Sequence, residues 1–164
     1  PNLWGERWSK LVLNCMANPL AGLSGLGTAE VRSDPETRRL ATFLAAEAIE
    51  VGRACGHEVE PILGIPAQRF VDAAHGRGLE EVGRDIAADA GSRSGGRPSM
   101  LQDVMKGRRT EIDHLNGYVS AEGRRVGVRT PFNDAVVATV HSHGVGRLTP
   151  DRANLEPLIA MLPG

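Results

Sequence analysis

Apolar residues recur every three to four positions along most of this chain, and that spacing predicts helices. The clearest case is residues 3–23, where Trp8 and Cys15 belong to one apolar face of a long helix. Pro19 should kink or end that helix near Asn18, because proline lacks the backbone N–H that a helix interior needs.

Caps, prolines and glycines divide the middle of the chain into further elements. Asp34-Pro35 is a helix cap followed by a first-turn proline, and it starts a predicted helix that runs to about residue 54. Residues 67–90 should form one helix or two short ones, because two glycines in their middle favour a break. Residues 91–98, made mostly of Gly, Ser and Arg, are too polar to pack and are predicted to be a linker.

The last third of the chain is also predicted to be helical. One helix should start at Glu111 and end near residue 126, before a glycine. Thr130-Pro131 should start another that ends near residue 144, and Thr149-Pro150 should start a last short helix. We find no convincing strand, so the 164 residues are expected to form a single all-α domain, a multihelical bundle.

Composition excludes several classes of protein. The formal net charge is -1, so no broad basic field points to nucleic acid or to an anionic membrane. No apolar run is long enough to span a bilayer and no signal peptide opens the sequence, so we expect a cytoplasmic protein. Cys15 and Cys55 are interpreted as small core residues in a reducing compartment, although the sequence leaves open a disulfide between them.

The most informative stretch is residues 99–116, which holds two helix-start signals. Ser99 and Gln102 have the spacing of a capping box, and Glu111 falls at the first position of the next predicted helix, where a carboxylate is favoured. Two interpretations fit this spacing. Ser99 and Glu111 either act only as helix caps, or both face one cleft.

A polar stripe runs along the first predicted helix. Lys10, Asn14 and Asn18 are spaced four residues apart, so in a helix each is displaced by about 40° from the one before. The stripe is either a solvated face or a line of hydrogen-bonding groups that faces a cleft.

Two other constellations are weaker. His141 and His143 have an H-x-H spacing, but no third ligand lies nearby in the sequence, so we interpret them as surface histidines and predict no metal site. Arg108 and Arg109 could attract an anion, or form a solvated pair in a loop. The glycines between residues 22 and 27 follow a helix and lack the G-x-G-x-x-G order of a nucleotide-binding loop.

Several of these segments resemble the C-terminal domain of the ketopantoate reductase (2-dehydropantoate 2-reductase) family. They occur in the family's order and at its spacings, from about Trp8 to Val140. The segments are Trp8-Ser9-Lys10-Leu11, Asn14, Asn18-Pro19-Leu20, Ser99-Met100-Leu101-Gln102-Asp103, Thr110-Glu111-Ile112-Asp113, Leu115-Asn116-Gly117 and Val128-Arg129-Thr130-Pro131-Phe132-Asn133.

The resemblance implies a fold, an activity and a set of site residues. The family reduces a 2-oxo acid to a 2-hydroxy acid with NADPH, a step of pantothenate and coenzyme A biosynthesis, and its helical domain is similar to that of 6-phosphogluconate dehydrogenase. By motif, Lys10 corresponds to the catalytic lysine and Glu111 to the active-site glutamate. Asn14, Asn18 and Ser99 correspond to substrate-binding residues.

Such residue types suit the reduction of a ketone. A lysine ammonium can stabilise the charge that forms on the oxygen and hand over a proton. A carboxylate close by would hold the lysine in place and accept a hydrogen bond from a substrate hydroxyl. Amides and a hydroxyl would recognise an oxygen-rich small acid.

The resemblance also implies partners. An N-terminal Rossmann domain, in cis or in trans, would bind most of the NADPH, because no strand followed by G-x-G-x-x-G precedes Trp8. We expect this domain alone to be inactive. A homodimer is compatible, since related enzymes use this domain at dimer contacts.

Two departures from the family pattern leave the substrate open. Pro98 stands where a small polar residue is common, and the asparagine expected in the loop after Asn18 is missing, with Thr28 the nearest polar residue. A reductase of another 2-oxo acid is therefore an alternative. A hypothesis of a different class is a non-catalytic helical domain, used for dimerisation or binding, that lost its cofactor half.

Overall fold

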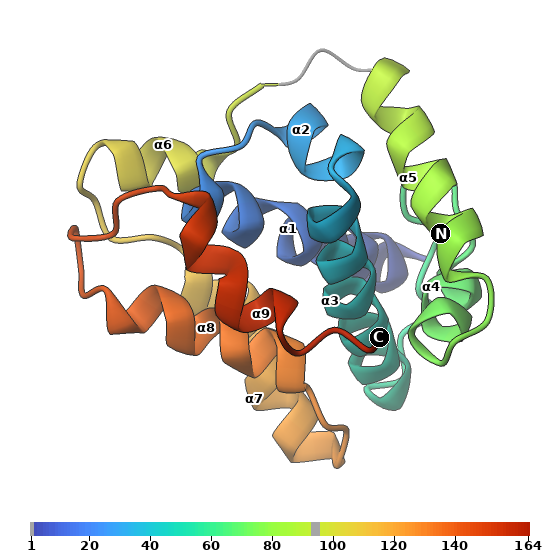
Figure 1. Ribbon diagram of the computed structural model, residues 1–164. Coiled ribbons are helices and arrows are strands. Elements are labelled where there is room, and N and C mark those ends of the chain that lie inside the picture. Colours follow the sequence, from blue (N-terminus) through green and yellow to red (C-terminus); the bar gives the residue numbers. More distant parts are fainter. Residues whose placement is uncertain (1, 93–95) are drawn as a thin grey trace.

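The computed structural model describes residues 2–92 and 96–164, and the side chains of residues 91 and 92 are not described. Within these residues every regular element is a helix, joined by turns and a single isolated bridge between Ile62 and Ile65 (Figure 1). The predicted all-α class is confirmed. The elements are α1 Leu3–Ser24, α2 Thr28–Ser33, α3 Pro35–Ala54, α4 Ala67–Ala74, α5 Leu79–Ser92, α6 Ser99–Met105, the 3-10 turn η1 Ile112–His114, α7 Asn116–Val126, α8 Pro131–Ser142, the 3-10 turn η2 Arg152–Leu155 and α9 Glu156–Ile159.

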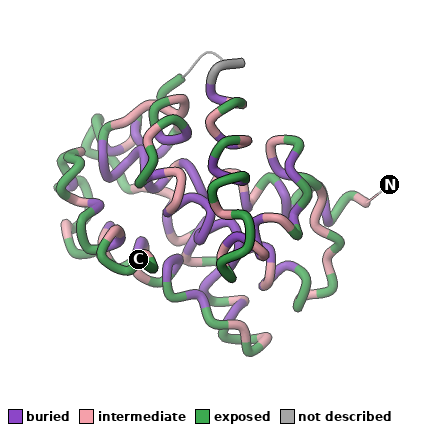
Figure 2. The backbone as a smooth tube through the Cα atoms, turned by 45° about the vertical axis from the view of Figure 1, so that its right-hand side comes forward, coloured by how far each residue is buried: buried purple, intermediate pink, exposed green. Residues whose placement is uncertain are grey.

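Helices α1 and α3 pack against each other at the centre of the bundle. Helices α4 and α5 lie on one side of them, and α7, α8 and α9 on another (Figure 1). The buried positions follow the inward faces of these helices, while exposed residues follow the outer faces and the turns (Figure 2). Burial of this apolar surface is the main force that holds the helices together.

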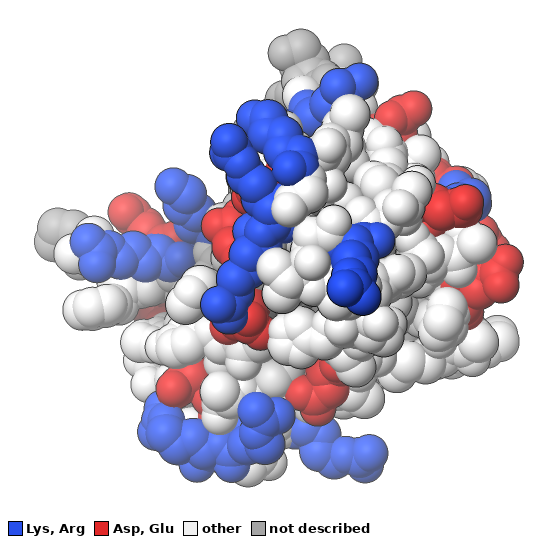
Figure 3. Space-filling view, turned by 90° about the vertical axis from the view of Figure 1, so that its left-hand side faces the viewer, with Lys and Arg blue, Asp and Glu red and all other residues white. Residues whose placement is uncertain are grey.

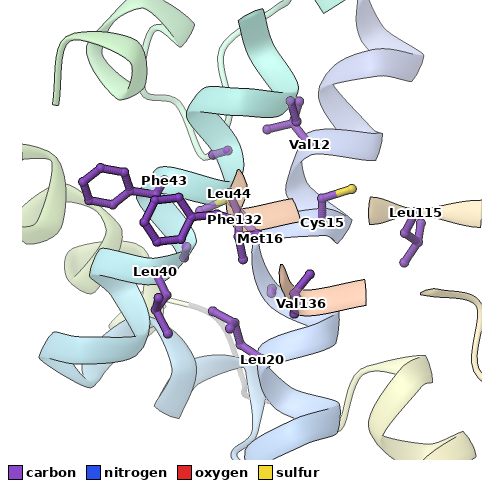
Figure 4. Close-up of a cluster of buried hydrophobic side chains, with 14 of the residues drawn as sticks. Val12, Cys15, Met16, Leu20, Leu40, Phe43, Leu44, Leu115, Phe132 and Val136 are labelled. Atoms are coloured by element: carbon purple, nitrogen blue, oxygen red, sulfur yellow. The ribbon is translucent and has the colours of Figure 1, made fainter. Parts of the chain in front are cut away.

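Helices α1 and α3 approach each other closely at the end of the core where Trp8 lies. The Trp8 indole is 5% exposed, and its Nε1 donates a hydrogen bond to the carbonyl of Ala48 at 2.8 Å. A glycine is needed opposite, because a β-carbon at Gly52 would lie 2.3 Å from Trp8 Nε1. Further along the interface, aliphatic side chains of α1 meet those of α3 and α8. Figure 4 labels Val12, Cys15, Met16, Leu20, Leu40, Phe43, Leu44, Leu115, Phe132 and Val136 in this cluster.

A buried carboxylate joins α3 to the start of α8. Glu47 accepts hydrogen bonds from the backbone N–H groups of Phe132 (2.8 Å) and Asn133 (2.9 Å), and from Asn133 Nδ2 (2.8 Å). Burial raises the pKa of Glu47 to about 7, and the N–H donors oppose that rise because they favour the charged form. The Thr130 side chain makes no cap hydrogen bond, so the Glu47 carboxylate accepts from the first N–H groups of α8 in place of a conventional cap.

Several predicted boundaries are confirmed. Asp34 caps α3 by accepting from the N–H groups of Glu36 (3.1 Å) and Thr37 (2.9 Å). The break predicted within residues 67–90 separates α4 from α5. The predicted linker starts later than expected, because α5 runs to Ser92, and residues 93–95 lie outside the described part of the chain.

Two boundary predictions are wrong, and a third is narrowed to one of its alternatives. Of the kink or end predicted at Pro19, the end is excluded, because α1 continues to Ser24 and stops at Gly25, a glycine with a φ of 83°. The helix predicted from Glu111 is divided in two, because Leu115, with φ -106° and ψ -98°, separates η1 from α7. The last short helix begins after Asp151, which caps it by accepting from Ala153 N at 2.8 Å.

Both cysteines are free thiols, so the disulfide that the sequence left open is absent. Cys15 is fully buried and Cys55 is partly exposed. Among the described residues, no helix combines the length and the apolar character that crossing a bilayer would require.

Candidate functional site

Ser99 and Glu111 are in direct contact. Ser99 Oγ donates a hydrogen bond to Glu111 Oε1 at 2.6 Å. The structure therefore supports the interpretation that both face one place, and the capping box predicted at Ser99 is wrong. Ser99 is the first residue of α6 and not its cap, and Gln102 Nε2 donates to the carbonyl of Arg97 at 2.9 Å. The Ser99 hydroxyl makes no hydrogen bond to the described backbone, so it is available to bind a ligand.

The polar stripe on α1 has unoccupied hydrogen-bonding groups. Lys10 is exposed, and Asn14 and Asn18 are partly exposed. None of the three side chains makes a hydrogen bond or an ion pair with another described residue. An amine and two amides with no protein partner are available to bind a polar ligand.

Two contacts connect the α1 stripe to the Ser99–Glu111 pair. Gly22 lies one turn beyond Asn18 on the same side of α1, and a β-carbon there would lie 3.0 Å from Cγ of Met100, the neighbour of Ser99. Asn116, which follows Glu111 across the 3-10 turn, donates from Nδ2 to the carbonyl of Cys15 at 3.1 Å. The start of α6 thus packs on α1 one turn beyond Asn18, and the start of α7 is hydrogen-bonded to the residue that follows Asn14.

Lys10 and Glu111 do not form an ion pair. Within the described chain Lys10 has no ion-pair partner, and the Glu111 carboxylate is held by Ser99. The expectation that a carboxylate holds the lysine in place is therefore not met in this structure. Since Lys10 is at the exposed end of the stripe, its long side chain can reorient when a ligand binds.

Basic side chains flank this region. Arg97, Lys106, Arg108 and Arg109 are all exposed, and they stand on either side of Ser99 or just before Glu111 in the sequence. Figure 3 shows Lys and Arg side chains gathered in a band on the face of the molecule that carries α6 and the loop after it. Such a band attracts an anionic ligand, with a strength that falls as salt is added.

A pocket of about 410 Å³ borders the segment around Glu111. Its lining comes mainly from the loop before η1, from η1, from the end of α8 and from the turn after it, and includes Arg108, Ile112, Asp113, His141 and Val145. His141 Nε2 lies 2.8 Å from Asp113 Oδ1. Partial burial acts to raise the pKa of Asp113, but the hydrogen bond from Arg109 and the contact with His141 hold it below its usual range. The sequence did not reveal this pocket, because its two walls are far apart along the chain.

Comparison with known proteins gives a consistent result. The family described as "Ketopantoate reductase PanE/ApbA C terminal" matches residues 2–144. A 2-dehydropantoate 2-reductase of Mesorhizobium japonicum is 34% identical over 142 residues, which are 87% of this chain and 37% of that protein. A 2-dehydropantoate 2-reductase of Vibrio cholerae is 33% identical over 136 residues, 83% of this chain and 40% of that protein.

The fold is similar to that of a solved relative. The crystal structure of a PanE/ApbA family ketopantoate reductase from Ralstonia eutropha superposes with a TM-score of 0.63 at 26% identity, covering 82% of this chain and 39% of the other. The chain therefore spans roughly two fifths of the length of the relatives it matches.

Proposed function

This chain belongs to the ketopantoate reductase family, as its C-terminal domain, and from this premise we propose that it is the substrate-binding and catalytic domain of an NADPH-dependent 2-oxo acid reductase. The proposed reaction reduces 2-dehydropantoate (ketopantoate) to pantoate. The Ser99–Glu111 hydrogen bond carries the proposal, because it puts a hydroxyl and a carboxylate together at the start of α6, a helix that packs on α1.

Each residue has a proposed role in that chemistry. The nicotinamide cofactor would supply a hydride to the ketone carbon of the substrate. Lys10 would stabilise the negative charge that develops on the ketone oxygen and give it a proton, which completes the hydroxyl. Asn14 and Asn18 would bind the oxygen-rich part of the acid through their amides.

Glu111 and Ser99 would bind the hydroxyl of the substrate. The Glu111 carboxylate is an acceptor, so it suits a substrate hydroxyl, and Ser99 can donate either to Glu111 or to the substrate. The two groups pair with each other at 2.6 Å, and a substrate would have to share or replace this hydrogen bond.

The cofactor itself would be bound mainly by another domain. The glycines at residues 22–27 form the end of α1 and the turn into α2, so they do not build a phosphate-binding loop after a strand. We therefore assign NADPH binding to an N-terminal Rossmann domain, in cis or in trans. A homodimer through this helical domain and a cytoplasmic location belong to the same proposal.

A direct test uses the complete protein that contains this chain. It would be assayed with NADPH and with NADH against a panel of 2-oxo acids that includes ketopantoate, following oxidation of the cofactor. We expect turnover with NADPH and the highest kcat/KM for ketopantoate. A higher kcat/KM for another 2-oxo acid would correct the substrate, and no turnover with any of them would favour a non-catalytic binding domain.

A lysine pair provides the matched variants. Lys10→Ala should lower kcat by about 100-fold or more, because it removes the proposed proton donor. Lys106→Ala, which removes an exposed lysine of the basic band at the end of α6, should leave kcat within about twofold of wild type and raise only KM, because the band attracts the anionic acid but takes no part in proton transfer. Near-normal turnover in Lys10→Ala would remove Lys10 from the mechanism.

A further inference from the structure

The carbonyl of Cys15 lacks its regular hydrogen-bond donor within α1. In an α-helix this oxygen would accept from the N–H of residue 19, and Pro19 has none. Cys15 is 0% exposed, so water does not replace the missing donor. A buried carbonyl left unpaired is costly, so the fold must supply a donor from another element.

Asn116 supplies that donor. Its Nδ2 lies 3.1 Å from the Cys15 oxygen, and the side chain is 0% exposed. The bond joins residues that are 101 positions apart in the sequence, from the middle of α1 to the first residue of α7. It explains how α1 can continue through an internal proline.

A chain of buried groups fixes the orientation of the Asn116 amide. Asn133 Nδ2 donates to Leu44 O (3.2 Å) and to Glu47 Oε2 (2.8 Å), and the backbone carbonyl of Leu44 can only accept, which fixes the orientation of the Asn133 amide. Asn133 therefore presents its Oδ1 to Asn116, whose Nδ2 donates to it at 2.9 Å. Asn116 must point its NH₂ group toward both Asn133 and Cys15, and its own Oδ1 has no partner among the described residues.

Both ends of the Asn116–Cys15 bond are next to candidate site residues. Cys15 directly follows Asn14 and is within one turn of Asn18. Asn116 follows Glu111 across the 3-10 turn, and its neighbour Leu115 belongs to the same buried cluster as Cys15 (Figure 4). Movement of Asn116 away from α1 would therefore shift the segment that carries Glu111 relative to the two asparagines.

We propose that Asn116 is a positioning residue of the active site: its amide takes the place of the backbone hydrogen bond that Pro19 removes, and so holds the Glu111 segment against the turn of α1 that carries Asn14 and Asn18. Asn116 itself does not touch the substrate. The positioning role rests on the proposed reductase function, whereas the hydrogen bond can be tested without any activity.

The test is a double-mutant cycle in the complete protein, with Asn116→Ala, Pro19→Ala and the two combined. Pro19→Ala restores a backbone N–H that can donate to the Cys15 carbonyl. In the double variant it does not replace the hydrogen bond that joined α1 to α7. Two quantities are measured for each variant. One is the rate at which Cys15 is alkylated, read by mass spectrometry, which reports local opening around this turn. The other is kcat and KM for the 2-oxo acid and for NADPH.

We expect the double variant to recover the slow alkylation of Cys15 but not the kinetic constants. Asn116→Ala should speed alkylation of Cys15 by about tenfold, because it leaves the buried carbonyl unpaired. In the double variant Cys15 should be alkylated as slowly as it is in Pro19→Ala. Its kcat/KM for the 2-oxo acid should nevertheless stay about tenfold or more below that of Pro19→Ala, because Glu111 is displaced, while KM for NADPH is unchanged.

Other outcomes would overturn the proposal. Recovery of kcat/KM together with the slow labelling would show that Asn116 only stabilises the fold. Unchanged labelling in Asn116→Ala would show that its bond to Cys15 is unimportant. Absence of activity in the wild-type protein would refute the proposed function and the positioning role with it, and labelling would still decide on the bond. If Asn116→Ala does not fold, Asn116→Ser, whose hydroxyl is too short to reach Cys15, takes its place in the cycle.

Discussion

The hydroxyl of Ser99 donates to the carboxylate of Glu111 at 2.6 Å, across twelve residues of chain that contain a helix, a loop and a turn. Neither side chain is needed where it stands to cap a helix. Because neither side chain makes a cap hydrogen bond, a ligand can displace the hydrogen bond between them without disturbing a helix end. The first prediction follows from this contact.

Glu111→Gln should keep the contact and remove the charge. The glutamine Oε1 can still accept from Ser99, so the unfolding midpoint of the chain should change little. In the complete protein we expect kcat/KM for the 2-oxo acid to fall by about 100-fold, because a neutral amide is a weaker acceptor than a carboxylate for a substrate hydroxyl. Steady-state kinetics check this, with Glu58→Gln, at an exposed position, as the control. Unchanged kinetics would exclude a role for the Glu111 charge.

Gly52→Ala should destabilise the chain strongly. The added β-carbon would lie 2.3 Å from Trp8 Nε1, and the indole is held by its bond to Ala48, so α1 and α3 would have to separate. We expect a loss of about 1–3 kcal/mol in the free energy of unfolding, measured by urea denaturation.

Gly83→Ala is the matched control for that substitution. Gly83 is inside α5, and its nearest new contact would be the flexible Arg38 side chain at 3.3 Å. Because alanine favours helix over glycine, we expect no loss, and a gain of up to about 1 kcal/mol. An equal loss in both variants would show that the Trp8 contact is not the cause.

The buried Glu47 should make stability depend on pH. Its pKa in the folded chain is raised to about 7 from an ordinary 4.5, so the folded state binds the proton more tightly than the unfolded state does. The corresponding stability is present below the ordinary pKa and is lost as the pH rises through about 7. Between pH 5 and 8 the free energy of unfolding of wild type, measured relative to Glu47→Gln, should fall by about 2–3 kcal/mol. A difference that is flat or grows with pH would contradict this.

The two thiols should react in a fixed order. Cys15 is fully buried, which raises the pKa of its thiol, so it should be alkylated only when the chain opens. Cys55 is partly exposed and should react first. Burial and the neighbouring Glu122 carboxylate raise the pKa of Cys55, so its rate at pH 7 should be below that of a small free thiol. Peptide mapping after timed alkylation checks the order, and faster labelling of Cys15 would contradict the packing of α1.

The sequence by itself determined most of the helices. Apolar spacing located α1, α3 and α8, and the Asp34 cap and the break between α4 and α5 followed from local rules of helix starts and glycines. These features depend on interactions between residues a few positions apart, which the sequence shows directly. The motifs also pointed to Ser99 and Glu111, which the structure brings together.

Only the tertiary structure decided the rest. Pro19 is tolerated inside α1 because Asn116, 101 positions beyond Cys15, donates to the carbonyl that the proline leaves unpaired. The Ser99 hydroxyl turns to Glu111 and not to its own helix, and the helix expected from Glu111 breaks at Leu115 so that Asn116 can reach α1. Local propensity cannot reveal these outcomes, because each depends on a hydrogen-bond partner that folding brings from a distant part of the chain.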